Sequence, residues 1–142
     1  FVVVGKPSLK YARLGIDEYL KRMRKYVGVD FVSVKNGTKE EEGERLLKAS
    51  ENSYRIVFDE RGELIDTKTL TEKVNKLEMD GSCKLVTVLI GGAEGHSAEL
   101  RGSADLIISF GRMTIQHELA LTAAVEQFYR VYTIKRGEPY HR

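Results

Sequence analysis

The sequence has one cysteine, Cys83, and no long apolar run among its 142 residues. A single thiol excludes a disulfide within the chain and a metal site built from cysteines. No apolar segment is long enough to cross a bilayer and none resembles a secretory signal, so the expected location is cytoplasmic, with no membrane partner. The chain begins at Phe1 rather than methionine, and we expect a few residues to precede it.

An excess of charge of one sign is also absent, because 23 Lys and Arg residues face 21 Asp and Glu residues for a net charge of +2. The distribution of charge along the chain is more informative than the net charge. Residues 6–25 contain seven basic against two acidic residues, and residues 130–142 contain four against one. If the fold brings these two segments together, they form a surface for phosphate groups. The alternative is solvated helix faces and a solvated tail, and charge alone does not decide between the two.

Linkers, repeats and low-complexity stretches are missing as well. Apolar residues make up 42% and charged residues 31% of the chain, which is ordinary for a globular protein. A chain of this length has room for one domain with a full core, so residues 1–142 are expected to form a single domain.

Short apolar runs alternate with helical patterns along the chain. The runs predict strands at residues 1–4, 29–34, 54–59, 84–90 and 105–110, with a possible last strand at 131–134. Helices are expected at residues 9–25, 38–50, around 70–77, 97–102 and 114–130. This alternation predicts an α/β fold in which a mostly parallel sheet carries helices on both faces.

Polar residues at the element boundaries predict caps and turns. Thr38 precedes three glutamates and is expected to cap the second helix. Thr114 is a candidate cap for the last helix, and a ligand contact is compatible with that role. Residues 60–63 are expected to form a turn after the third strand.

Three loops leave the carboxyl ends of predicted strands, where ligands bind in parallel sheets. They follow Asp59, Ile90 and Ser109. Gly91 and Gly92 remove side chains where the backbone turns sharply or approaches a ligand. The Gly-Gly-x-x-Gly spacing matches neither the phosphate-binding P-loop nor the dinucleotide fingerprint. A tight turn into the helix near Ser97 explains two of the three glycines without any ligand.

Several motifs occur together and in order along the chain. They are Phe-Asp-Glu-Arg-Gly at 58–62, Leu-Ile-Gly-Gly-Ala-Glu-Gly-His-Ser at 89–97, Ser-Phe-Gly-Arg-Met-Thr-Ile-Gln-His-Glu at 109–118, Glu-Gln-Phe-Tyr-Arg at 126–130 and Gly-Glu-Pro-Tyr-His-Arg at 137–142. This combination closely resembles the SPOUT-class methyltransferases of the RlmH type, over the whole chain.

The resemblance implies a function and a fold that the patterns alone do not give. Such enzymes transfer a methyl group from S-adenosylmethionine to N3 of a pseudouridine in 23S ribosomal RNA, within the assembled 70S ribosome. They are homodimers with an alpha/beta knot, in which the C-terminal segment forms a trefoil knot. Because the sulfonium methyl is already activated, direct displacement requires no metal.

The resemblance also implies site residues by position. Apolar side chains would form the walls of an adenine pocket, and glycines would let the backbone approach closely. The implied cofactor-binding residues are Phe58, Gly91, Phe110, Gly111, Arg112, Met113, Thr114 and Ile115. In the loop at 110–115, roles of the backbone are expected more than roles of side chains.

The C-terminal residues Tyr140, His141 and Arg142 are expected to hold the target base. His141 or His117 would take the imide proton, and Arg142 would stabilise the anionic base. His117 has a plainer alternative as a packed or surface residue. Deleting the tail is expected to cost little stability. In a dimer, the tail of one subunit would complete the pocket of the other.

Two further features have less specific roles. Glu126 and Arg130 are four residues apart on one helix and are expected to pair, with a dimer contact preferred over catalysis. His96 receives no role. Two other functions remain open: a ribosome-binding factor without catalysis, and a SPOUT methyltransferase acting on another RNA such as tRNA.

Overall fold

The computed structural model describes residues 1–142. Five strands form one sheet, and every strand pairing in it is parallel. The strands are β1 (Val2–Val4), β2 (Val32–Val34), β3 (Tyr54–Leu64), β4 (Val86–Ile90) and β5 (Leu106–Ser109), in the order β2-β1-β4-β3-β5. The helices are α1 (Lys10–Met23), α2 (Lys39–Ala49), α3 (Thr67–Met79), α4 (Ala98–Gly102) and α5 (His117–Lys135).

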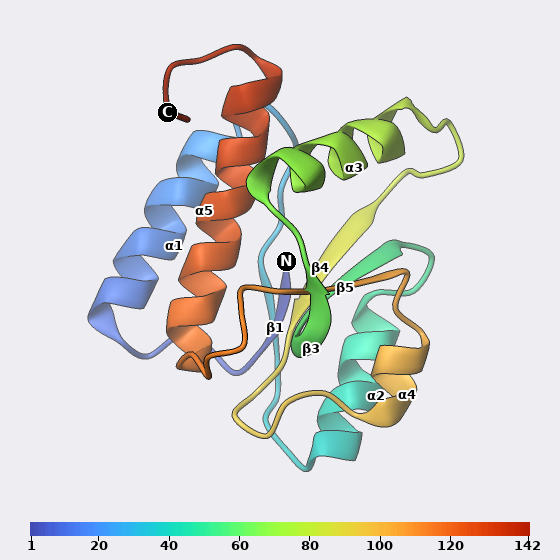
Figure 1. Ribbon diagram of the computed structural model, residues 1–142. Coiled ribbons are helices and arrows are strands. Elements are labelled where there is room, and N and C mark those ends of the chain that lie inside the picture. Colours follow the sequence, from blue (N-terminus) through green and yellow to red (C-terminus); the bar gives the residue numbers. More distant parts are fainter.

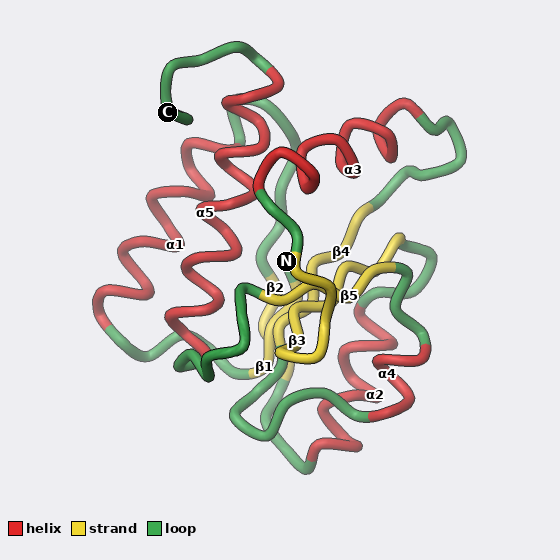
Figure 2. Tube along the Cα trace, in the orientation of Figure 1, coloured by secondary structure: helices red, strands yellow, loops and turns green.

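Helices cover both faces of the sheet, as Figures 1 and 2 show, which confirms the predicted α/β class. Alternate strand residues point to opposite faces. Ile56 and Val88 pack with α1, α3 and α5, whereas Val57 and Leu89 pack with α2 and α4. Because both faces are buried, these strands appear as continuous apolar runs without alternation.

The last helix is longer than predicted. Residues 131–134 were expected to form a strand, and this prediction is wrong because they continue α5 to Lys135. Val131 and Thr133 are fully buried, and the Thr133 hydroxyl donates to the Arg130 carbonyl. Packing against the core therefore outweighs the preference of β-branched residues for strands.

Helix caps follow the predicted chemistry with one exception. Thr38 and Glu41 form a reciprocal capping box at α2, as expected for Thr38. Thr114 does not cap α5. Instead, the side chain of Gln116 accepts a hydrogen bond from the Leu119 amide, so the helix begins at His117.

The turn predicted at residues 60–63 lies inside β3. Phe58 and Glu63 both align with Ile108 of β5, so residues 59–62 bulge out of the ladder and the strand then resumes. A side chain at Gly62 would lie 2.6 Å from the Ile108 carbonyl carbon. Glycine at this position thus allows β3 and β5 to stay in contact next to the bulge.

Two further expectations concern membrane-spanning helices and the knot. No helix combines the length and apolar character that a bilayer crossing requires. The trefoil knot implied by the resemblance stays a prediction.

Candidate functional site

A cavity of about 480 Å³ lies beside the β3 bulge and the ends of β4 and β5. Residues 58–61 at the β3 bulge line it together with residues after β4 and β5, so the three predicted segments do converge at one site. The first turn of α5 closes one side through His117 and Ala120. A cavity of this size lies within the range of about 300–1,000 Å³ typical of small-molecule sites.

Most of the residues implied by the resemblance line this cavity. They are Phe58, Gly91, Phe110, Gly111, Met113, Thr114 and Ile115. Arg112 is the exception, because it does not line the cavity although it lies in the same loop. This placement fits the expectation that the loop acts through its backbone more than through its charged side chain.

Aromatic and aliphatic side chains form one wall. The rings of Phe58 and Phe110 stack with their centroids 4.7 Å apart, which joins β3 just before its bulge to the loop after β5. Phe110 and Ile115 are partly exposed, and Met113 is 82% exposed. The wall is therefore apolar but open, as a site for a flat heteroaromatic ring requires.

The loop between β5 and α5 is held at its start by a side chain. The Ser109 hydroxyl donates to the Gly111 carbonyl at 2.7 Å and accepts from the Gly111 amide at 3.1 Å. These two hydrogen bonds fix the turn that places Phe110 over Phe58. Ser109 was not predicted as a site residue, although its place at the end of a strand was a usable signal.

The glycine loop is packed against the protein itself. A side chain at Gly91 would lie 2.9 Å from Cε1 of His96, and one at Gly92 would lie 2.9 Å from Oε2 of Glu42. Both His96 and Glu42 are buried. The two glycines are thus required by neighbouring side chains, independently of any ligand.

His96 is a site residue that sequence reasoning missed. It lines the cavity, and its Nε2 lies 3.0 Å from the Phe58 carbonyl oxygen. Burial lowers the pKa of His96 below its ordinary value, although the Phe58 carbonyl and Asp59 act in the opposite direction. The signal in the sequence was a titratable residue directly after a glycine loop at a strand end.

The residues that follow His117 fix the entry to α1. Glu118 is buried, and its carboxylate accepts from the Ser8 amide and hydroxyl and from the Leu9 amide. Although burial alone raises the pKa of Glu118, these hydrogen bonds hold it below its ordinary value. The start of α5, with His117 beside the cavity, is therefore anchored to the start of α1.

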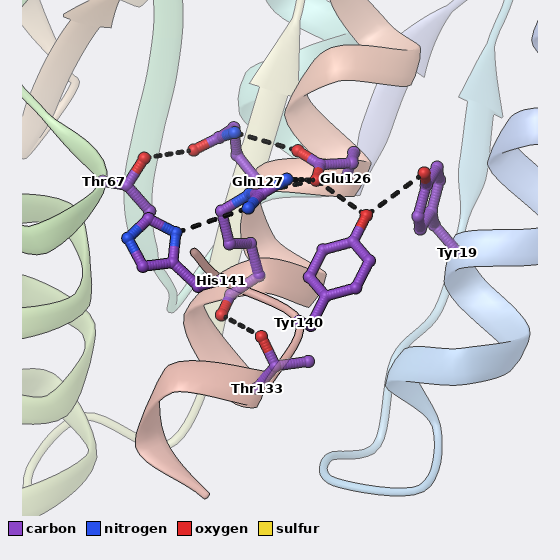
Figure 3. A network of polar contacts seen from close by, with 8 residues as sticks. Tyr19, Thr67, Glu126, Gln127, Thr133, Tyr140 and His141 are labelled. Atoms are coloured by element: carbon purple, nitrogen blue, oxygen red, sulfur yellow. Dashed lines mark hydrogen bonds and ion pairs between the residues drawn. The ribbon is translucent and has the colours of Figure 1, made fainter. Parts of the chain in front are cut away.

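The C-terminal tail is packed against α5 and α1, which corrects the expectation that it adds little to the core. The Tyr140 hydroxyl lies 3.0 Å from Glu126 Oε1 and 3.3 Å from the Tyr19 hydroxyl (Figure 3). Its ring packs edge-on against Tyr129 with a centroid distance of 4.8 Å. Burial, with the hydrogen bonds to Tyr19 and Glu126, raises the pKa of Tyr140.

The predicted pair of Glu126 and Arg130 is confirmed, with Arg130 Nη2 2.6 Å from Glu126 Oε1. Arg130 also lies over the Tyr140 ring, and its Nη1 is 3.3 Å from His141 Nδ1. Figure 3 shows that Gln127 extends this network from Glu126 to Thr67, at the start of α3. The pair thus holds the tail of its own chain.

The tail and the cavity lie at different places on the molecule. None of Tyr140, His141 and Arg142 lines the cavity. The cavity adjoins the first turn of α5, whereas the tail follows its last turn (Figure 1). The tail folds back so that Tyr140 contacts Glu126, which is nine residues, or about 14 Å, along α5 from His117. Within one subunit, the structure does not bring the predicted base-holding residues to the predicted cofactor residues.

The two basic segments do come together. α1 packs along α5, with Tyr19 against Tyr129 and Tyr26 stacked on Tyr132. Arg24 and Lys25, which directly follow α1, therefore lie near the tail. Arg130 and Lys135 are paired with Glu126 and Glu78, so the phosphate-binding surface stays a prediction.

In the comparison with known proteins, a family model and two similar proteins agree with each other. A family model described as "Predicted SPOUT methyltransferase" matches residues 1–141. A "Ribosomal RNA large subunit methyltransferase H" from Thermus thermophilus is 46% identical, covering 99% of this chain and 96% of that protein. The protein of the same name from Deinococcus radiodurans is 43% identical, with the same two coverages.

A solved structure shows a more distant similarity. It is the SpoU methyltransferase AviRb from Streptomyces viridochromogenes in complex with AdoMet. The TM-score is 0.47 at 14% identity, and the match covers 91% of this chain and 56% of that one.

Proposed function

The chain belongs to the SPOUT methyltransferase family, and on that premise we propose that it methylates N3 of a pseudouridine in large-subunit ribosomal RNA, with S-adenosylmethionine as the methyl donor. The observation that carries the proposal is the cavity built by three strand-end loops and the start of α5. Relatives named for large-subunit ribosomal RNA, similar over nearly the full length of both chains, support the substrate class.

The cavity offers the groups that this cofactor needs. The stacked rings of Phe58 and Phe110 provide an apolar surface for adenine, and the backbone of the Gly91 loop can approach the ligand on the other side. Asp59, Glu60 and Glu94 also line the cavity, together with Lys39, Arg61 and Arg101. Carboxylates are thus available for the sulfonium and amino groups, although these six residues carry no net charge.

Methyl transfer then proceeds by direct displacement. The N3 nitrogen forms a bond to the methyl carbon while the sulfur takes the electron pair of the breaking S–C bond. The protein must align these atoms and accept the imide proton. His117 lines the cavity and is the candidate base that this subunit supplies. Arg142 would stabilise the anionic base, with Tyr140 and His141 holding it in place.

A homodimer would bring the tail to the cavity. Large apolar side chains are exposed around the start of α5 and on the adjoining face of α1, namely Tyr11, Leu14, Met113, Ile115 and Leu119. Such a patch beside a cavity marks a protein interface. A second copy of this chain, related by a twofold axis, is the occupant that this patch suggests. We propose that each active site combines the cavity of one subunit with the tail of the other.

Labelled-methyl incorporation tests the proposed substrate. Purified protein and labelled S-adenosylmethionine are incubated with tRNA, naked ribosomal RNA, 50S subunits or 70S ribosomes, and the modified nucleotide is identified by mass spectrometry. We expect labelling of one pseudouridine in 70S ribosomes. Because those particles occur in the cytoplasm, we also propose a cytoplasmic location for the protein. Preferential labelling of tRNA would refute the substrate, and ribosome binding without any transfer would favour the non-catalytic factor.

A further inference from the structure

His96 lies between two walls of the cavity. Its Nε2 is 3.0 Å from the carbonyl oxygen of Phe58, just before the bulge in β3. Its ring occupies the space that a side chain at Gly91 would need, at the end of β4. The ring is therefore a link between the strand that carries the aromatic wall and the loop that carries the glycines.

The hydrogen bond to Phe58 fixes which nitrogen of the His96 ring carries the proton. A carbonyl oxygen can only accept a hydrogen bond, so Nε2 carries the hydrogen and donates it to Phe58. In the neutral ring, Nδ1 is then left without a proton. His96 is 4% exposed, so a charged ring would be poorly solvated.

Charged groups on three elements surround the ring. Asp59 in the bulge of β3 and Glu42 on α2 favour the protonated ring, whereas Arg101 on α4 disfavours it. Arg101 Nη1 also donates to the His96 carbonyl oxygen at 2.6 Å. Glu42 accepts from the Gly37 amide at 3.1 Å, so its carboxylate is already engaged.

We propose that His96 is a positioning residue whose neutral ring sets the shape of the cofactor cavity, and that protonation of this ring weakens binding of the cationic cofactor. The inference rests on the proposed function, because it takes S-adenosylmethionine as the ligand of this cavity. A protonated ring would place a positive charge at the wall that must receive a sulfonium, and like charges in a partly dry site repel. S-adenosylhomocysteine has a neutral sulfur and avoids that repulsion.

Calorimetric titrations at pH 5.5, 6.5 and 7.5 test the inference. Wild-type protein is compared with His96→Gln, whose amide can donate to Phe58 but does not titrate, and with His96→Leu, which cannot donate. We expect wild-type affinity for S-adenosylmethionine to fall on acidification, with a smaller fall for S-adenosylhomocysteine. His96→Gln should bind well at all three pH values. His96→Leu should bind on the order of fivefold more weakly even at pH 7.5, since the Phe58 carbonyl loses its donor.

Glu99→Gln is the control, because Glu99 is an exposed ionisable residue on α4, close to His96 in the sequence, that does not line the cavity. It should keep the pH dependence of the wild type. NMR titration of the histidine rings gives an independent readout, in which the His96 ring should titrate below its ordinary pKa and lower still with cofactor bound. Amide spectra of each variant verify the fold.

Two results would overturn the role of His96 while the proposed function stands. These are wild-type affinity in His96→Leu, and an unchanged pH dependence in His96→Gln. Failure of the wild-type protein to bind S-adenosylmethionine at any pH would overturn the proposed function, and this inference with it.

Discussion

Gly91 and Gly92 show how one residue pattern can satisfy two demands. Paired glycines at a strand end suggest close approach to a ligand, and both do line the cavity. Yet each also lies where a side chain would collide with a buried polar group, His96 or Glu42. A sequence shows the glycine but not the neighbour that requires it, so sequence reasoning found Gly91 and overlooked His96.

Replacing Gly91 with Ala should destabilise the fold by about 1–3 kcal/mol, because the new Cβ would lie 2.9 Å from a hydrogen-bonded ring. The same replacement in a His96→Ala background should cost clearly less, since the colliding ring is gone. Urea unfolding of the four proteins in this cycle measures the coupling. Gly81→Ala is the control, with no atom near its new Cβ. Equal penalties in both backgrounds would mean that His96 is not the obstacle.

Strands and helices were predicted well where the local residue pattern agrees with the packing in the core. Strands buried on both faces and helices with apolar stripes were found from spacing, and the capping box at Thr38 was found from residue chemistry. The strand expected at residues 131–134 was wrong because a local preference competed with long-range burial of Val131 and Thr133. The extension of β3 past its bulge was missed because it depends on pairing with β5, which is distant in sequence.

Glu118 on α5 connects two helices, because it also contacts the start of α1. Leu9, the residue before α1, makes no side-chain cap, and both carboxylate oxygens of Glu118 accept hydrogen bonds there instead. Glu118→Gln should cost about 1–3 kcal/mol, since its NH₂ group would face an amide donor. Urea unfolding at pH 7 measures this loss, with exposed Glu99→Gln as the control, expected within about 0.5 kcal/mol.

The pH dependence of stability gives a second test of Glu118. Its pKa is lower in the folded than in the unfolded chain, so its stabilising effect is complete above the ordinary value of 4.5. The effect is lost as the pH falls through the lower, folded value. Between pH 6 and pH 3, wild-type stability should therefore fall more steeply than that of Glu118→Gln. Parallel curves for the two proteins would contradict the assigned hydrogen bonds.

At the scale of the whole molecule, the sequence predicted which strand ends meet but not where the tail lies. Strand-end loops converge because parallel strands share an edge, and this follows from topology. The position of the tail depends on contacts of Tyr140 with Tyr19 and Glu126, which no local pattern encodes. The tail was therefore expected to be dispensable for stability, and the structure shows it packed.

Removing residues 140–142 should consequently lower the stability by about 2–4 kcal/mol, because the buried part of the Tyr140 ring and its hydrogen bonds are lost. Arg142→Ala should have an effect within about 0.5 kcal/mol, since Arg142 is exposed. Thermal or urea unfolding compares the two. A deletion as stable as the full chain would show that Tyr140 does not pack in solution.

Mixing two defective chains tests whether the active site is shared between subunits. Arg142→Ala should leave the cavity intact but impair methyl transfer, whereas Phe110→Asp should abolish cofactor binding by breaking the aromatic wall. Each homodimer alone should then be nearly inactive on 70S ribosomes. Random exchange makes half of the dimers mixed, and each mixed dimer holds one intact composite site, so about one quarter of wild-type activity should return.

The result distinguishes two arrangements because a site built within one subunit would recover nothing. In that case every cavity with a working wall would still carry the Arg142→Ala tail, and the mixture would transfer no more label than the separate proteins. Size-exclusion chromatography and subunit-exchange measurements on tagged chains verify that mixed dimers form. With exchange verified, recovery of activity would show that the cavity of one subunit works with the tail of another, since Tyr140, His141 and Arg142 do not line the cavity of their own chain.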